Sequence, residues 1–160
     1  MASVKRLLGH WCPRMLVMML DWVIPCNEVE LKGQLLNLRG VGWDQLWSTG
    51  YPATFNTNLV LRFVFDVNDQ DSVQVQLGFV NRDTGAAFAN PLAAQVSPPP
   101  RPGDWQPGDS ILASHLVLGL AGLPVPEPGR YGIQVTVGDQ LLTTVPFWAR
   151  LGMPPASAIQ

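Results

Sequence analysis

Oxygen-bearing side chains gather in one short segment of the sequence, where they could bind a metal ion. Asp66, Asn68, Asp69 and Asp71 supply carboxylate and amide oxygens, and hard cations such as Ca²⁺ prefer such ligands. The segment lacks the spacing and the glycine of an EF-hand loop. Asp and Asn are also frequent in ordinary turns, because their side chains bond the local backbone. The segment is therefore a weak calcium candidate, and no metal site is favoured.

The residue types of hydrolytic active sites are present, but their arrangement does not favour catalysis. A catalytic histidine would have to be His115, because His10 lies in the N-terminal segment. Ser114 and His115 are neighbours in one expected strand, so their side chains point to opposite faces and cannot pair directly. The sequence also lacks a GxSxG turn, the CxxC spacing of zinc sites and a phosphate-binding glycine loop. We therefore predict a protein that is not an enzyme and has no cofactor.

Tryptophan is the most suggestive residue type in this chain, which contains six of them. Trp43, Trp47 and Trp105 fall in polar, loop-like segments. An aromatic ring in such a place can anchor a protein partner or stack on a sugar. The alternative is that these rings cap the open ends of a β-structure. We take the three as candidate partner-binding residues.

The composition indicates one globular domain whose surface carries few charges. Charged residues make up 14% of the 160 residues, against roughly 25% in a typical soluble protein. The net charge is −2, and the basic residues are scattered singly. We expect no nucleic-acid partner, because proteins that bind nucleic acids carry clustered basic residues. A protein partner or self-association suits a surface that is partly neutral or apolar.

The start of the chain is typical of neither an export signal nor a membrane span. His10, Pro13 and Arg14 interrupt its apolar run, and Asp21 ends it. Neither a secretory core nor a span of about 18 residues survives these breaks. We therefore expect a cytoplasmic protein without a membrane span, with its first buried strand at Met15–Ile24.

The chain divides into an N-terminal extension (residues 1–14), a single β-sandwich domain (residues 15–150) and a C-terminal tail (residues 151–160). Cys12 and Cys26 are the only cysteines, and two thiols make no disulfide framework. We expect two separate reduced thiols, and their pairing stays open if strand geometry brings them together.

Alternation of apolar and polar residues predicts most of the β-strands. In the run SVQVQLGFVN, apolar residues alternate with glutamine and glycine, which is the period of a half-buried strand. Gly85 and Gly138 mark turns, the second with Asp139 in a two-residue hairpin. The proline-rich segment Ser97–Asp109 is expected to be a loop, because proline cannot donate to a ladder. Further strands are expected at Leu59–Asp66, Ala86–Val96, Ser110–Leu120, Tyr131–Val137 and Leu141–Phe147.

The same alternation assigns side chains to faces. The last strand is expected to carry Leu141, Thr143, Val145 and Phe147 on one face. Pro146 indicates that this strand lies at an edge, or that the proline nitrogen points away from a neighbour. On other strands the outward face carries apolar residues that a sheet facing water would not require. These outward residues include Val60, Val64, Ile111 and Val117.

The segment LAGLPVPEPGRYGIQV contains the components of a tyrosine corner. In Greek-key sandwiches, a tyrosine near the start of a late strand packs its ring on the core and bonds its hydroxyl to the backbone upstream. Here Pro128 and Gly129 would form the bend, and Tyr131 would be the tyrosine whose ring packs on the core. Leu120 and Leu123 would be the core residues before the corner. The motif therefore indicates the topology, and the turn at Gly138 sets the register.

These elements resemble a family of uncharacterised bacterial proteins, a domain of unknown function with an immunoglobulin-like sandwich. The resemblance implies an all-β fold, an antiparallel immunoglobulin-like Greek-key β-sandwich of seven to eight strands. It carries no catalytic residue, because the family has no assigned activity. It covers roughly Met15 to Arg150. The motifs that carry it are MLVMML, Gly40-Val41-Gly42-Trp43, HLVLGLAGL, Pro128-Gly129-Arg130-Tyr131 and Val145-Pro146-Phe147.

Two functional hypotheses follow. The favoured one is a non-enzymatic β-sandwich protein that acts through protein contacts, as a homo-oligomer or as a component of a larger assembly. The alternative is a small-ligand module that binds carbohydrate through the loop tryptophans or calcium through the segment Asp66–Asp71. The first requires a buried outer sheet face, whereas the second requires an exposed aromatic or acidic site.

Overall fold

The protein is built from β-strands. The computed structural model describes residues 18–32, 35–66, 71–101, 103–104 and 111–154. Within these ranges the chain forms twelve strands and no helix. The strands are β1 (Met18–Cys26), β2 (Glu28–Lys32), β3 (Leu35–Arg39), β4 (Gln45–Ser48), β5 (Ala53–Phe55), β6 (Asn58–Asp66), β7 (Val73–Asn81), β8 (Ala87–Val96), β9 (Ile111–Gly119), β10 (Leu123–Val125), β11 (Gly129–Val137) and β12 (Gln140–Leu151).

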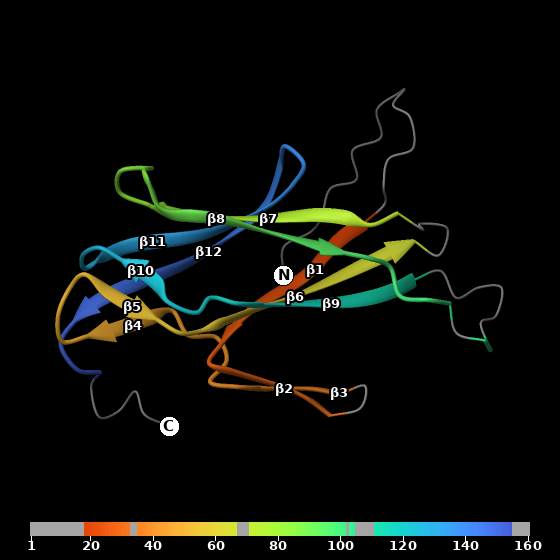
Figure 1. Ribbon diagram of the computed structural model, residues 1–160, viewed down its shortest axis with the longest axis horizontal. Coiled ribbons are helices and arrows are strands. Elements are labelled where there is room, and N and C mark those ends of the chain that lie inside the picture. Colours follow the sequence, from red (N-terminus) through yellow and green to blue (C-terminus); the bar gives the residue numbers. More distant parts are fainter. Residues whose placement is uncertain (1–17, 33–34, 67–70, 102, 105–110, 155–160) are drawn as a thin grey trace, which may run out of the picture.

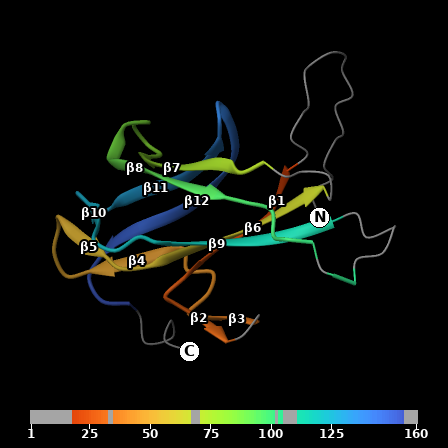
Figure 2. The same ribbon diagram turned by 45° about the vertical axis from the view of Figure 1, so that its right-hand side comes forward.

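Two sheets form the two layers of the molecule. One is three-stranded, in the order β1-β6-β9, and the other is five-stranded, in the order β4-β12-β11-β7-β8. Their neighbouring strands are antiparallel, except for β4 and β12, which run parallel. Figure 1 shows β7 and β8 of the five-stranded sheet above β6 and β9 of the three-stranded sheet, and Figure 2 shows the same stacking from a second direction. The pairs β2-β3 and β10-β5 complete the described part of the chain.

The hydrophobic core lies between the two layers. Strand β6 contributes four inward residues that are completely buried, Leu59, Leu61, Phe63 and Phe65. The facing sheet contributes alternate residues of β7 and β11, as the period of two requires. The predicted inward faces of these strands are confirmed. The buried residues of β7 and β11 are Val73, Val75, Leu77, Phe79, Tyr131, Ile133 and Val135.

The structure contains more strands than the seven to eight that we predicted. The additional strands β2, β3, β4, β5 and β10 have only three to five residues each, which is too short for alternation to identify them. The long strands lie close to their predicted positions. Strand β1 continues to Cys26, beyond the predicted end at Ile24, and residues 15–17 lie outside the described ranges.

A β-bulge changes which residues of β12 face the core. The two-residue turn at Gly138 (φ +56°) is present as predicted. The pairing of β11 with β12 then shifts by one residue between Val135 and Thr136. Leu142 packs against the core, whereas Leu141 is 50% exposed. Our prediction that Leu141 shares a face with Val145 and Phe147 is wrong, because a bulged residue reverses the alternation on its strand.

Pro146 lies in a part of β12 that has one neighbour. Strand β12 pairs with β11 along most of its length, but with β4 only over Trp148–Leu151. The side of Pro146 that faces away from β11 is therefore not paired, which suits a residue without an N–H group. Strand β12 as a whole is internal to its sheet and is not an edge strand.

Tyr131 ties the start of β11 to the connection that precedes it. Its side chain is completely buried, and its hydroxyl donates a hydrogen bond to the carbonyl of Glu127 at 2.8 Å. Its ring stacks on Phe147 with 5.5 Å between centroids and meets the edge of Phe88 at 4.8 Å. These contacts are the ones expected of a tyrosine corner. Burial raises the pKa of Tyr131, so the hydroxyl stays protonated and able to donate.

We expect Tyr131→Phe to fold but to be less stable by about 1 kcal/mol, the usual net worth of one hydrogen bond. The substitution removes the donor to the Glu127 carbonyl and keeps the ring contacts. Urea unfolding of the two proteins measures the difference. An unchanged unfolding midpoint would show that the hydroxyl does not stabilise the corner.

Candidate interaction surfaces

The three tryptophans predicted to bind a partner lie in different surroundings. Trp43 packs against the core, with its ring 5.8 Å from that of Phe147 in an edge contact, and its Nε1 is buried without a hydrogen-bond partner. Trp47 is half-buried on β4, opposite Arg150 of β12. Trp105 lies outside the described residues. The structure therefore does not gather the three into one site, and their role in partner binding stays a prediction.

The structure describes only two of the four residues of the calcium candidate. Asp66 ends β6 and is half-buried, and Asp71 is exposed before β7. Asn68 and Asp69 lie outside the described residues. Within the described ranges, no group of three or more histidine, cysteine or acidic side chains is placed to hold a metal ion. Calcium binding at this turn stays an untested prediction.

The outer face of the three-stranded sheet carries apolar and aromatic side chains in three rows. Residues that lie opposite one another on neighbouring strands share a face. The pairings of β6 with β1 and with β9 define these rows. They are Ile24-Val60-Val117, Trp22-Arg62-His115 and Met19-Val64-Ala113. We call this surface the apolar face.

The predicted outward residues contribute unequally to the apolar face. Val117 is 40% exposed, Met19 is 50% exposed and Val64 is half-buried. Val60 faces outward as predicted, in the row Ile24-Val60-Val117, but it is completely buried and offers no exposed surface. It occupies the central strand, where both neighbouring strands flank it. The side chain of Ile111 lies outside the described set.

The middle row of the apolar face is organised by polar and aromatic contacts. Arg62 forms an ion pair with Asp21, the bulged residue of β1. The rings of Trp22 and His115 flank Arg62 from the two edge strands and lie 5.6 Å apart. The only charged residues in this organised row are therefore paired with each other, which keeps the face as a whole close to neutral.

A hairpin with two different faces lies beside the apolar face. Strands β2 and β3 pair with each other, and both views place them on the side of the three-stranded sheet away from the five-stranded sheet (Figures 1 and 2). One face of the hairpin carries the ion pairs Lys32–Glu30 and Arg39–Glu28. The opposite side of the hairpin carries apolar side chains, and Leu31 there is 70% exposed. The apolar residues are Val29, Leu31, Leu36 and Leu38.

The outer face of the five-stranded sheet has a different character. Trp148 of β12 lies opposite Arg130 of β11, and Arg150 lies opposite Trp47 of β4. These residues alternate with Phe147 and Ala149, which are buried in the core. We call Trp47, Trp148, Arg130 and Arg150 the Arg-Trp cluster. Trp148 and the arginines were not predicted as site residues, although their alternation with buried residues on the last strand is the signal that identifies an outward face.

Trp148 lies between two guanidinium groups. The Cζ atom of Arg150 lies 4.5 Å from the centroid of the Trp148 ring, and that of Arg130 lies 5.9 Å away. Both distances fall within the range of cation–π attraction. Trp148 is nevertheless 42% exposed. The cluster therefore presents an ordered aromatic and cationic surface to solvent.

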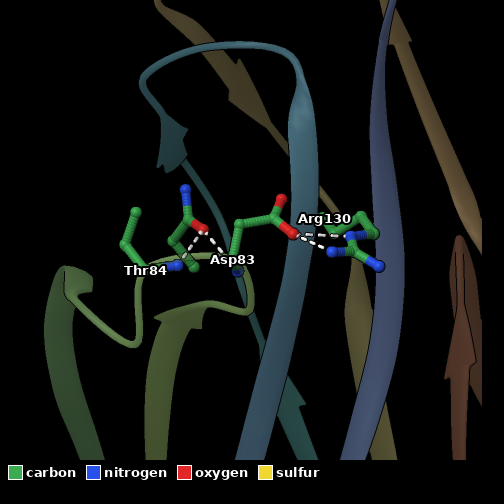
Figure 3. A network of polar contacts seen from close by, with 4 residues as sticks. Asp83, Thr84 and Arg130 are labelled. Carbon is green, nitrogen blue, oxygen red and sulfur yellow. Dashed lines mark hydrogen bonds and ion pairs between the residues drawn. The ribbon is translucent and has the colours of Figure 1, made fainter.

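Arg130 also forms an ion pair with the turn between β7 and β8. Figure 3 shows Arg130 and Asp83 pointing toward each other, with Nε of Arg130 2.6 Å from Oδ1 of Asp83. The turn itself is held by Asn81, whose Oδ1 accepts the backbone N–H groups of Asp83 and Thr84 at 2.8 and 3.2 Å. The hydrogen bond from Arg130 lowers the pKa of Asp83, so the carboxylate is charged at neutral pH.

A small groove and a buried thiol are further features of the described residues that bear on catalysis and small-molecule binding. A groove of about 270 Å³ between β8 and the β9–β10 turn is lined by apolar residues such as Phe79, Leu92 and Leu123, and Asn90 is its only polar side chain. This volume lies just below the usual range of ligand pockets, about 300 to 1,000 Å³, whereas two other surface hollows of about 400 Å³ fall within it. Cys26 is buried as a free thiol, and burial raises its pKa, which disfavours the reactive thiolate. Among the described residues, no helix is long and apolar enough to cross a membrane.

The fold defines an all-β protein with two layered sheets and two distinct outer faces. The chain belongs to the family of unknown function DUF6941, whose model matches residues 21–150. A comparison with curated proteins finds no match. Among solved structures, one similar chain is the Pseudomonas fluorescens alkylpurine DNA glycosylase AlkC bound to DNA containing an abasic site analog, with 13% sequence identity and a TM-score of 0.40. That match covers 67% of this chain and 28% of the other, and we draw nothing about function from so distant a similarity.

We expect Asp83→Asn to be slightly less stable than the wild type at pH 7 and equally stable in acid. Because the pKa of Asp83 is lowered in the folded protein, the ion pair contributes stability above the ordinary value of 3.8 and loses it as the pH falls through the lowered pKa. The effect is small, since water screens an exposed pair. Urea unfolding at several pH values measures it. A stability difference that stays constant from pH 7 to pH 3 would contradict the assignment.

Proposed function

We propose that this protein is a non-enzymatic module that acts through protein contacts, and that the apolar face of the three-stranded sheet is the contact surface. The observation that carries the proposal is the exposure of Met19 and Val117 in rows that also contain Trp22 and Ile24. A sheet that faces water normally alternates apolar and polar residues. Contiguous apolar surface on a soluble protein marks an interaction site.

The fold that we propose for this module is the immunoglobulin-like Greek-key β-sandwich that the sequence motifs indicate. The layering of the two sheets and the contact between Tyr131 and Glu127 support it. In such a fold the inner faces form the core, so the outer faces and the loops are free to bind partners. The partner is either a second copy of this chain or another component of an assembly.

The neutral character of the apolar face also supports this function. Its arginine is paired with Asp21, so burying the face would not leave an unpaired charge, which would cost several kcal/mol. Trp22 lies in the middle row of the face, on the edge strand β1 beside Arg62. Tryptophan and arginine are the residue types that most often contribute large binding energies at protein interfaces.

We expect Met19→Glu and Val117→Glu each to weaken association at least about tenfold, because the new carboxylate would be buried without a partner. Leu141→Glu is the matched control, since Leu141 and Met19 are both 50% exposed but Leu141 lies on the other sheet. Light scattering over a range of protein concentrations measures self-association. If the wild type is a monomer at the highest concentration, the same variants are used as baits in a pull-down.

Two results would contradict the proposal. One is equal association, or equal partner recovery, by the wild type and the two face variants. The other is a monomer from which no partner is recovered. In either case the small-ligand alternative would be examined next, by measuring whether calcium or a glycan panel raises the melting temperature, as binding to the folded state must.

A further inference from the structure

We propose that the Arg-Trp cluster on the five-stranded sheet is a second binding surface and that it takes an acidic, carboxylate-bearing segment of a partner protein. This surface lies on the layer opposite the apolar face (Figure 1). The inference rests on the proposed function in taking the ligand to be a polypeptide. It adds a separate site and the chemistry of the segment that would bind there.

The first argument is that the guanidinium of Arg150 lacks an anionic partner. Its Nε atom is buried and has no hydrogen bond. The ion pairs among the described residues involve Lys32, Arg39, Arg62 and Arg130, and none involves Arg150. The recorded contact of its guanidinium is with the ring of Trp148. An arginine held on a ring keeps the N–H groups of its two terminal nitrogens, and these match a carboxylate in a bidentate geometry.

The second argument is that the cluster is ordered before any ligand arrives. Arg150 lies on the ring of Trp148 at 4.5 Å, and Arg130 is held by the carboxylate of Asp83 (Figure 3). Side chains that are already fixed lose less conformational entropy on binding, which favours affinity. Trp and Arg together are also the residue types enriched in binding hot spots.

A further cation extends the surface across the sheet. The backbone N–H of Arg82 donates to the carbonyl of Arg130 at 2.8 Å. The side chain of Arg82 crosses Gly132, where a Cβ would lie 3.5 Å from its Cγ and Cδ atoms. Within the described ranges no ion pair involves the Arg82 side chain, and its charge helps to lower the pKa of the neighbouring Asp83. Arg82, Arg130 and Arg150 thus bring three positive charges to one face, and the carboxylate of Asp83 forms its ion pair with one of them, Arg130.

The geometry favours an extended segment as the ligand. The cluster and Arg82 span β4, β12, β11 and the turn after β7 on an open sheet face, rather than a closed pocket that would enclose a small anion. Acidic side chains at every second position of an extended peptide point to one side. Such a peptide could place successive carboxylates against successive arginines.

A peptide titration tests the inference. The probe is a capped hexapeptide that alternates Glu and Gly, and its control has Gln in place of Glu. We expect the acidic peptide, and not the control, to shift the Nε–H signal of Arg150 in the ¹⁵N spectrum of the full chain. That signal is assigned as the one missing from Arg150→Lys. Arg150→Lys keeps the charge but loses the planar fork, so we expect it to bind about tenfold more weakly.

Two further variants make the test specific. Arg82→Gln removes an exposed cation without a recorded partner and is expected to weaken binding severalfold, even if Arg150→Lys were to unfold. Arg39→Gln is the matched control, because it removes an exposed arginine from the hairpin and should leave binding unchanged. Circular dichroism and melting temperatures establish that each variant is folded.

Several outcomes would overturn the inference. These are equal binding of the Gln peptide, equal binding by Arg82→Gln and the wild type, and an equally strong shift with inorganic phosphate, which would indicate a site for small anions. Each leaves the proposed function intact, because Met19→Glu and Val117→Glu test association through the opposite layer. Conversely, peptide binding by a protein that does not associate through the apolar face would support this inference alone.

Discussion

The burial of Tyr131 is the constraint on which most of this structure depends. Its ring packs on Phe147 and Phe88, from two other strands of the five-stranded sheet. Its hydroxyl reaches the carbonyl of Glu127 at 2.8 Å, so this polar group can be buried without the cost of a lost hydrogen bond. A single side chain thus positions the start of β11 and the connection from β10. Strand β11 in turn pairs with both β12 and β7.

The two outer faces follow from this core through the period of the strands. When Phe147 and Ala149 are buried, Trp148 and Arg150 must point away from the core. In the same way, the inward residues of β6 leave Val60, Arg62 and Val64 on the outside of the three-stranded sheet. One outer face is therefore apolar with a paired charge, and the other is cationic and aromatic. The apolar face is consistent with a chain in which only 14% of residues are charged.

Much of the fold could be predicted from local patterns, whereas the register and the short strands could not. Apolar alternation is strong in β6, β7 and β11, and each was placed correctly. Strands such as β4 and β5, with four and three residues, are stabilised by pairing with β12 and β10, which are distant in sequence. A regular hairpin around Gly138 would place Tyr131 opposite Pro146, but the bulge at Leu142 places it opposite Phe147. No local signal marks that bulge, because the leucines at 141 and 142 are equally apolar.

The sequence by itself determined the all-β class, the positions of the long strands, the turns at Gly85 and Gly138, and the tyrosine corner. Each of these depends on the alternation of apolar and polar residues or on the conformational preference of one residue. Only the tertiary structure decided that Trp43 packs on the core, that Val60 is covered, and that Trp148 lies between Arg130 and Arg150. These outcomes depend on which strands become neighbours and in which register. Neighbours and register are set by packing between residues that are far apart in the chain, and a single bulge is enough to change them.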